Sequence, residues 1–132
     1  MKKFSGANNL ANMSWTRTAG ALSTAGSIVA ASFGSHGLSK VPEYTPKKQK
    51  QWEIANQFHL LNSVALTFLS PLLAKERLCL NVAGGLLSLG ITGFSGSIYA
   101  KVYTNDDRLG KGAPVGGVAL ILGWLSIALL RR

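Results

Sequence analysis

Two histidines are the residues of this 132-residue chain that are best suited to proton or metal chemistry. Imidazole titrates near neutral pH and binds transition metals, and an ionisable group inside a membrane marks a candidate functional site. We expect His36 and His59 to lie at one level of the fold, together with Glu53, Tyr99, Asp106 and Asp107. None of these residues has the local spacing of a known metal motif. We therefore expect no metal site and assign the histidines to structural hydrogen bonds, with a metal site or a proton relay as the alternative.

A polar stripe runs through the second apolar stretch of the chain. Its residues recur at steps of three and four, which places them on one face of a helix: Asn56, His59, Ser63, Thr67 and Ser70. Hydrocarbon offers no partners for amide, imidazole or hydroxyl groups, so this face must turn inward. The residues that we predict for a polar interior are His36, Asn56, His59, Asn62, Ser63, Thr67 and Tyr99.

The chain offers no recognisable catalytic set. The glycine-rich segment Gly34–Leu38 has no lysine after its last glycine and follows an apolar stretch, so we interpret it as the end of a helix and not as a phosphate loop. Ser35 and His36 are adjacent, and adjacent side chains diverge on a helix, so they do not form a nucleophile and base. We expect no catalytic residues, no cofactor and no enzymatic activity.

Four mainly apolar stretches must position these side chains, at residues 15–33, 54–73, 78–100 and 113–130. At a rise of 1.5 Å per residue each stretch reaches about 27–34 Å, enough to cross the hydrocarbon core of a bilayer. The sequence thus predicts an all-α bundle of four transmembrane helices with short loops and both termini on the same side. Residues 19–132 form this membrane domain, and residues 1–18 form a basic leader or N-terminal flank.

The composition favours a membrane protein over a soluble bundle. Only 14% of the residues are charged, against about 25% in soluble domains. The net charge of +9 comes from Lys and Arg at segment ends, which favours anionic lipid headgroups as partners and argues against nucleic acid. Lys plus Arg is balanced between the two membrane faces, so orientation stays open. We expect Cys79, the single cysteine, to be buried and inert.

The leader permits several interpretations. It is basic and lacks acidic residues, as a mitochondrial targeting segment does, but an ordinary basic flank or a cleaved signal ending near Ala30–Ser32 has the same features. We therefore expect an integral, multi-pass membrane protein, located in the mitochondrial inner membrane of a eukaryote or in the plasma (inner) membrane of a bacterium.

The third apolar stretch carries a ladder of small residues at every fourth position: Gly84, Ser88, Thr92, Gly96 and Ala100. Small residues with this spacing let membrane helices approach closely. We expect the ladder to pack against a helix of the same bundle or of a partner.

Several motifs in a fixed order resemble those of the DUF423 proteins of bacteria, called transmembrane protein 256 in animals. The similarity extends over about residues 19–130, and its motifs are Phe33–Leu38, Trp52–Ala55, Ser63–Leu66, Gly93–Tyr99, Ala113–Gly117 and Gly123–Trp124. The resemblance implies a small multi-pass membrane protein without an established activity. One residue departs from the pattern, since the family typically has His where this chain has Asn62. An activity that needed a titratable group there would be in doubt, whereas Asn can still hydrogen-bond between helices.

Two functions fit these features. The first is a non-enzymatic accessory, assembly or structural subunit that packs through small-residue helix faces in a membrane protein complex or a homo-oligomer. The alternative is a small transporter or channel for protons, metals or small solutes, with the polar stripe lining the path.

Overall fold

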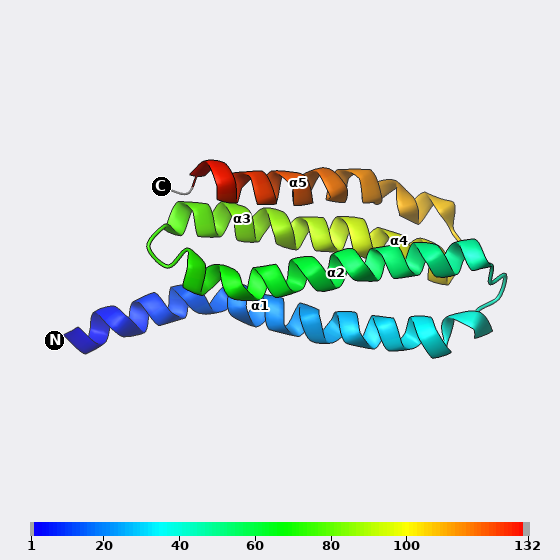
Figure 1. The fold of residues 1–132 in the computed structure, drawn as a ribbon, viewed down its shortest axis with the longest axis horizontal. Helices are drawn as coiled ribbons and strands as arrows, with labels where there is room; N and C mark the ends of the chain where they lie inside the picture. The colour runs from blue at the N-terminus through cyan, green and yellow to red at the C-terminus, as the bar shows by residue number, and fades with distance from the viewer. Residues whose placement is uncertain (1, 131–132) are drawn as a thin grey trace.

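The computed structural model describes residues 2–130, with side chains placed from residue 15 onward. Four helical rods lie side by side, and each runs antiparallel to the next one along the chain (Figure 1). The described residues contain no strand. The rods are α1 (Lys2–His36), α2 (Pro46–Leu72), a third rod made of α3 (Arg77–Gly90), η2 (Ile91–Gly96) and α4 (Ser97–Thr104), and α5 (Ala113–Leu130). Short turns of 3-10 helix, η1 (Leu38–Lys40) and η3 (Asp107–Gly112), lie in two of the connections. The predicted all-α bundle, with both chain ends at the same end, is confirmed.

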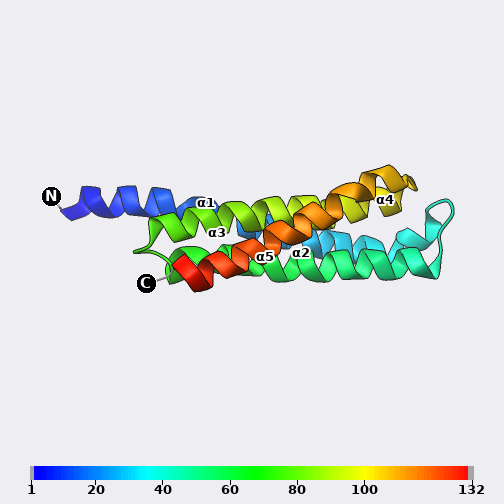
Figure 2. The same cartoon turned by 90° about the horizontal axis from the view of Figure 1, so that it is seen from above.

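The bundle consists of two helical hairpins that meet side by side. Helix α1 packs along α2, and α5 packs along α3 and η2. The hairpins join because α2 also contacts all three parts of the third rod, as the two perpendicular views indicate (Figures 1 and 2). Helices α2 and α5 therefore share a neighbour without packing closely on each other.

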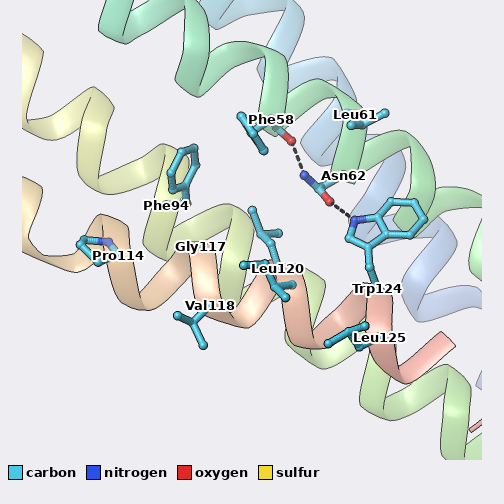
Figure 3. A pocket seen from close by; sticks show the side chains of 11 residues that line it. Phe58, Leu61, Asn62, Phe94, Pro114, Gly117, Val118, Leu120, Trp124 and Leu125 are labelled. Carbon is cyan, nitrogen blue, oxygen red and sulfur yellow. Dashed lines mark hydrogen bonds between the residues drawn. The ribbon is translucent and has the colours of Figure 1, made fainter. Parts of the chain in front are cut away.

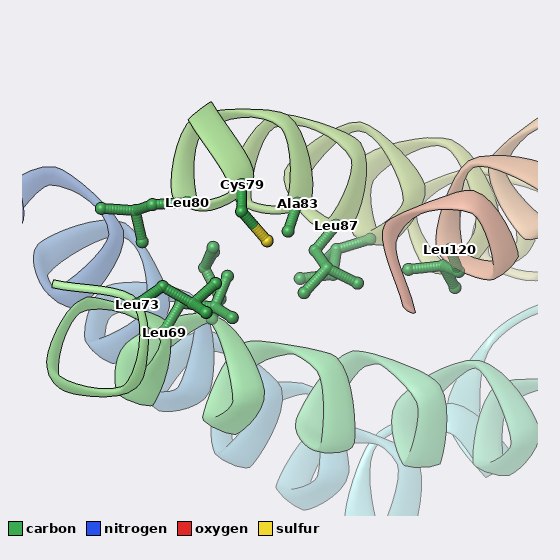
Figure 4. Packing of buried hydrophobic residues seen from close by; sticks show 9 residues of the cluster. Leu69, Leu73, Cys79, Leu80, Ala83, Leu87 and Leu120 are labelled. Atoms are coloured by element: carbon green, nitrogen blue, oxygen red, sulfur yellow. The ribbon is translucent and has the colours of Figure 1, made fainter. Parts of the chain in front are cut away.

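The largest apolar core lies near the end of the bundle that holds the termini. Its buried members come from α2, the turn after it, the third rod and α5, and they are Leu66, Leu69, Leu73, Cys79, Leu80, Ala83, Leu87, Ile91 and Leu120. Figure 4 shows Cys79 pointing into this cluster. Its side chain is only 1% exposed, so the expected burial of the cysteine is confirmed.

Helix α2 begins eight residues earlier than the predicted start at residue 54. The prediction failed because the lysines around residue 48 suggested a loop. Thr45 caps the helix, since its hydroxyl oxygen accepts a hydrogen bond from the Lys48 backbone N–H at 3.2 Å, and Pro46 occupies the first helical position. The charged first turns of α2 therefore extend the helix beyond its apolar part.

The third rod contains a π-helical segment, η2, that the apolar pattern did not predict. Such segments are rare and occur frequently at functional sites. Three consecutive residues of η2 contact the two neighbouring helices. Gly93 lies against Gly116 of α5, the Phe94 ring meets the Phe58 ring of α2 edge-on at a centroid distance of 5.0 Å, and the Ser95 hydroxyl donates to the Ala55 carbonyl of α2 at 2.7 Å. The widened turn thereby holds α2 and α5 in position at once.

Two stretches of the described chain combine the length and the apolar composition of a membrane span. They are Arg77–Thr104, with a mean hydropathy of 1.5, and Asp107–Leu130, with a mean hydropathy of 2.1. Helices α1 and α2 carry more polar residues and do not meet the same criterion, so their crossing of a bilayer stays a prediction.

The predicted ladder of small residues divides between two environments. Gly84 is buried against α1, where an added Cβ would lie 2.9 Å from the Thr16 methyl carbon. A Cβ on Gly96 would meet no atom within 4 Å, and Thr92 is exposed. Ser88 and Thr92 donate to carbonyls of their own helix, and Ala100 is half-buried. The ladder is not one contact face inside the chain, and its contact with a partner helix stays a prediction.

Two helix backbones approach closely between η2 and α5 instead. A Cβ added to Gly93 would lie 3.0 Å from the Gly116 Cα, and a Cβ added to Gly116 would overlap the backbone of Gly93 and Phe94. Backbone cannot give way as a flexible side chain does, so only glycine fits at both positions.

We predict that Gly116→Ala destabilises the fold, because the new methyl group has to push η2 away from α5. The expected cost is about 1–3 kcal/mol, measured as a lower midpoint of thermal unfolding in mild detergent. Gly117→Ala is the matched control, since its Cβ would make an ordinary contact of 3.6 Å with the Phe94 ring. Equal midpoints for the two variants would contradict the close approach.

Candidate functional site

A seam of small and polar residues joins α1 to α2. On α1 its members alternate in steps of four and three, and they are Thr16, Gly20, Ser23, Ser27, Ala30 and Gly34. This spacing is the 3.5-residue repeat of left-handed helix pairs, which keeps one narrow face on the partner helix. Gly20 allows the closest approach, because a Cβ there would overlap the backbone of Thr67.

The middle of this seam holds a connected network of side chains, which we call the polar cluster: Ser23, Asn56, His59, Ser63 and Tyr99. The Ser23 hydroxyl lies 2.6 Å from the Ser63 hydroxyl and 3.1 Å from His59 Nε2. On its other side, His59 Nδ1 lies 3.1 Å from the Tyr99 hydroxyl. Asn56 Nδ2 donates to the Tyr99 hydroxyl at 3.1 Å and to the Ser27 carbonyl at 2.7 Å. The polar cluster thus links α1, α2 and α4.

Aromatic rings cover the polar cluster on the side of the loops. The Trp52 ring packs on the Tyr99 ring at a centroid distance of 4.5 Å, and its indole N–H donates to the Ala30 carbonyl at 2.8 Å. Phe33 packs on the other side of Trp52 at 5.3 Å. Trp52 is itself only 7% exposed, so the cluster has a bulky apolar cover at this end.

The chemistry open to the polar cluster is the exchange of hydrogen bonds. A neutral imidazole has one donor and one acceptor nitrogen, and each hydroxyl is both a donor and an acceptor. The hydrogen bonds along the path from Ser63 through Ser23 and His59 to Tyr99 can therefore all change direction together, so that each donor becomes the acceptor. Such a reversal is what a proton relay requires, but the same bonds also hold three helices in register.

The structure brings four of the seven residues predicted for the polar interior into the polar cluster: Asn56, His59, Ser63 and Tyr99. Thr67 lies on the same seam and donates to the Ser63 carbonyl at 2.9 Å. Asn62 is 1% exposed but faces away from the cluster, toward α5. His36 is exposed at the end of α1 and does not reach the cluster. The two histidines are therefore not brought together.

The acidic residues at the loop end have local partners. Asp107 lies 3.6 Å from the Lys101 ammonium, and Glu53 accepts a hydrogen bond from Gln49 at 2.9 Å. Hydrogen bonds from the Arg108 side chain, and then from its backbone N–H, hold the pKa of the Asp106 carboxyl below its ordinary value. Within residues 15–130, no group of three or more His, Cys, Asp or Glu side chains could hold a metal ion.

A second candidate site is an apolar groove between α2 and α5 (Figure 3). The groove is about 570 Å³ in volume and is lined by Phe58, Leu61, Asn62, Phe94, Pro114, Gly117, Val118, Leu120, Ile121, Trp124 and Leu125. At one end the Trp124 indole N–H donates to Asn62 Oδ1 at 2.8 Å, and Asn62 Nδ2 donates to the Phe58 carbonyl at 2.8 Å. The Trp124–Asn62 bond links the two hairpins along the groove, and the bond to Phe58 within α2 holds the Asn62 carboxamide in place.

The partners of the polar stripe were not predicted from the sequence. Ser23 and Ser27 on α1 supply two of the hydrogen-bonding groups, and the Trp124 indole binds the buried Asn62. The alternation of three and four residues along α1 was a signal that could have identified Ser23 and Ser27 as a matching face. No local signal points from Asn62 to Trp124, because the pairing depends on how α5 packs.

We predict that Tyr99→Phe destabilises the bundle, since it removes the hydroxyl that contacts both Asn56 and His59. Groups left without a partner in a half-buried site cost about 1–3 kcal/mol, which thermal unfolding in mild detergent measures. Tyr103→Phe is the control, because Tyr103 is 59% exposed on the same helix. A midpoint for Tyr99→Phe that matches this control would show that the polar cluster contributes little to stability.

Comparison with known proteins gives one consistent family. The family model described as "Protein of unknown function (DUF423)" matches residues 30–117. A UPF0382 membrane protein of Staphylococcus haemolyticus is 34% identical over 108 residues, which cover 82% of this chain and 87% of that protein. A UPF0382 membrane protein of Bacillus subtilis is 34% identical over 112 residues, with coverage of 82% and 88%. No solved structure matches the chain.

These matches confirm the membrane location and the family resemblance that the sequence predicts. The similar proteins are named membrane proteins, in agreement with the membrane location predicted from the apolar stretches. The matched region begins at Ala30 and runs through the polar cluster residues of α2 and α4 to Gly117 in the groove. With this coverage and identity, the chain belongs to the DUF423 family of membrane proteins.

Proposed function

We propose that this protein is a non-enzymatic, multi-pass membrane protein that serves as an accessory, assembly or structural subunit of a membrane complex or homo-oligomer. One observation carries the proposal. Within the side chains that the structure describes, every buried nitrogen or oxygen already has a hydrogen-bond partner. A substrate or catalytic site needs polar groups that are free to meet a ligand. The interior is therefore better suited to holding helices together than to binding a substrate.

The outer surfaces of α1 and α2 support the proposal that these helices cross the bilayer too. Their polar residues are turned toward each other along the seam, and large apolar side chains point outward. Leu22 and Val29 of α1 are each 70% exposed, and Phe68 of α2 is 57% exposed. Exposed apolar surface of this kind is stable in lipid and unfavourable in water.

The proposed contact with a partner lies on the outer side of the third rod. Gly85 and Gly96 both face open space, since an added Cβ at either position meets no atom within 4 Å. Thr92, between them, is also exposed. A surface of small side chains allows the backbone of another helix to approach closely, which is the main source of attraction between helices in lipid.

We propose the plasma (inner) membrane as the location, and the bacterial origin of the similar proteins supports this. For a eukaryotic cell the proposal is the mitochondrial inner membrane. The net charge of +9 favours contact with anionic lipid headgroups and not with nucleic acid.

Native gel electrophoresis of membranes in mild detergent tests the accessory role. We expect the tagged full chain to migrate with a larger complex, whose partners mass spectrometry of the same band identifies. Gly96→Leu is expected to release the chain from that complex. It should not unfold the monomer, because a Cβ at this position would meet no other atom within 4 Å.

Ala25→Leu is the matched control, since Ala25 is an exposed small residue on the outer side of α1. This variant is expected to keep the complex. Migration of the unmodified chain at monomer size would contradict the accessory role.

A transporter or channel is the second candidate function, for protons, metals or small solutes. The hydrogen-bonded path from Ser63 through Ser23 and His59 to Tyr99 favours protons among these. If the protein conducts protons, proteoliposomes should acidify faster than empty vesicles, and His59→Ala should abolish the difference. Acidification equal to that of empty vesicles would exclude proton conduction.

A further inference from the structure

The groove between α2 and α5 has a position and a length that relate it to one leaflet of a bilayer. Along α5 its lining extends from Pro114 to Leu125. At a rise of 1.5 Å per residue this distance is about 16 Å. The hydrocarbon core of a bilayer is about 30 Å thick, so one leaflet contributes roughly 15 Å. The groove therefore runs along the depth of a single leaflet, beginning at the loop end of the bundle.

The wall of the groove offers only hydrocarbon contact to a ligand. Asn62 is its one residue with a polar carboxamide, and both ends of that group are hydrogen-bonded, to the Phe58 carbonyl and to the Trp124 indole. Figure 3 shows the rings of Phe58 and Phe94 toward one end and the Asn62–Trp124 pair toward the other. Apolar lining side chains such as Leu61 and Ile121 are each 60% exposed, so the groove opens sideways to the surroundings of the bundle.

The volume of the groove favours a narrow occupant. At about 570 Å³ it lies within the roughly 300–1,000 Å³ of small-ligand sites. A helix about 10 Å wide and 16 Å long occupies on the order of 1,200 Å³, so a partner helix would stand mostly outside. A lipid acyl chain is narrow enough to lie inside.

A free cation stands at the loop end of the groove. Lys111 precedes the lining residue Pro114 by three positions and is exposed. The neighbouring cations are engaged, since Lys101 pairs with Asp107 and Arg108 pairs with Asp106. Within the described residues no acidic group pairs with Lys111. Because Lys111 precedes the apolar lining of α5 along the chain, we expect its flexible side chain to reach the level of lipid phosphates.

We propose that this groove is a binding site for an anionic phospholipid, with one acyl chain between α2 and α5 and the phosphate of the headgroup at Lys111. The acyl chain fills the space between α2 and α5, which pack on the third rod and only sparsely on each other. The site is independent of the accessory role, because it uses a different face from Gly85 and Gly96.

Native mass spectrometry of the purified full chain tests the site. The detergent-solubilised protein is mixed with phosphatidylglycerol or with phosphatidylcholine carrying the same acyl chains, and the bound lipid is measured as added mass. We expect retained phosphatidylglycerol to exceed phosphatidylcholine about fivefold, because one lysine near an anionic headgroup contributes about 1 kcal/mol.

Two variants separate the acyl-chain site from the headgroup site. Gly117→Leu fills the groove, and we expect it to lower retention of both lipids about tenfold. Ala25→Leu, at an exposed small residue on the outer side of α1, is its control and should retain both lipids. Lys111→Gln should remove the preference for phosphatidylglycerol while leaving the phosphatidylcholine level unchanged. Lys40→Gln is the charge control, since Lys40 lies at the end of η1, in the connection between α1 and α2.

Three results would overturn the proposal. Unchanged lipid retention in Gly117→Leu would exclude the groove as the site. Equal loss of the preference in Lys111→Gln and Lys40→Gln would exclude a headgroup site at Lys111. A dimer mass, or a partner protein, that Gly117→Leu removes would identify a helix as the occupant. Circular dichroism of each variant checks that the helices are intact, and lipid loss counts only where they are.

Discussion

The pairing of polar side chains between α1 and α2 is the constraint on which most of this fold depends. If these helices cross the bilayer as we propose, their polar side chains have no solvent partners there, so each must find a partner across the helix interface. Ser23 meets Ser63 and His59, and Asn56 meets the Ser27 carbonyl. Because these bonds need short distances, the helices have to approach closely, and Gly20 permits that approach against Thr67. The polar residues that look unsuited to a membrane are thus the ones that fix the first hairpin.

The second hairpin depends on shape and not on polar groups. The π-helical turn of η2 directs Gly93 to α5, Phe94 to the groove and Ser95 to α2. A regular helix separates consecutive side chains by about 100° in a fixed pattern, and the wider turn changes that pattern locally. One short segment therefore sets both the contact of the third rod with its neighbours and one wall of the groove.

Apolar stretches and charged boundaries were sufficient to predict four helices, their order and the shared end of the termini, because these features are local. They also placed the polar stripe of α2 on an inward face. The start of α2 was misjudged, since its lysines outweighed the capping signal of Thr45 and Pro46. Partner residues could not be predicted where pairing depends on how helices distant in sequence dock: Ser23 and Ser63 are 40 positions apart, and Asn62 and Trp124 are 62 apart. The outward position of Gly96 likewise depends on rotation of the third rod, which the four-residue repeat alone does not determine.

The bond between Asn62 and Trp124 bears on how this family can diverge. Asn62 uses one donor, to the Phe58 carbonyl, and one acceptor, for the Trp124 indole. The resemblance to the family places a histidine at this position, and a neutral imidazole also has one donor and one acceptor. A neutral histidine at position 62 would therefore offer the same donor and acceptor, whereas an apolar residue would leave the indole N–H and the helix carbonyl without their partner. In this structure position 62 thus requires one donor and one acceptor, and neither bond depends on a group that titrates.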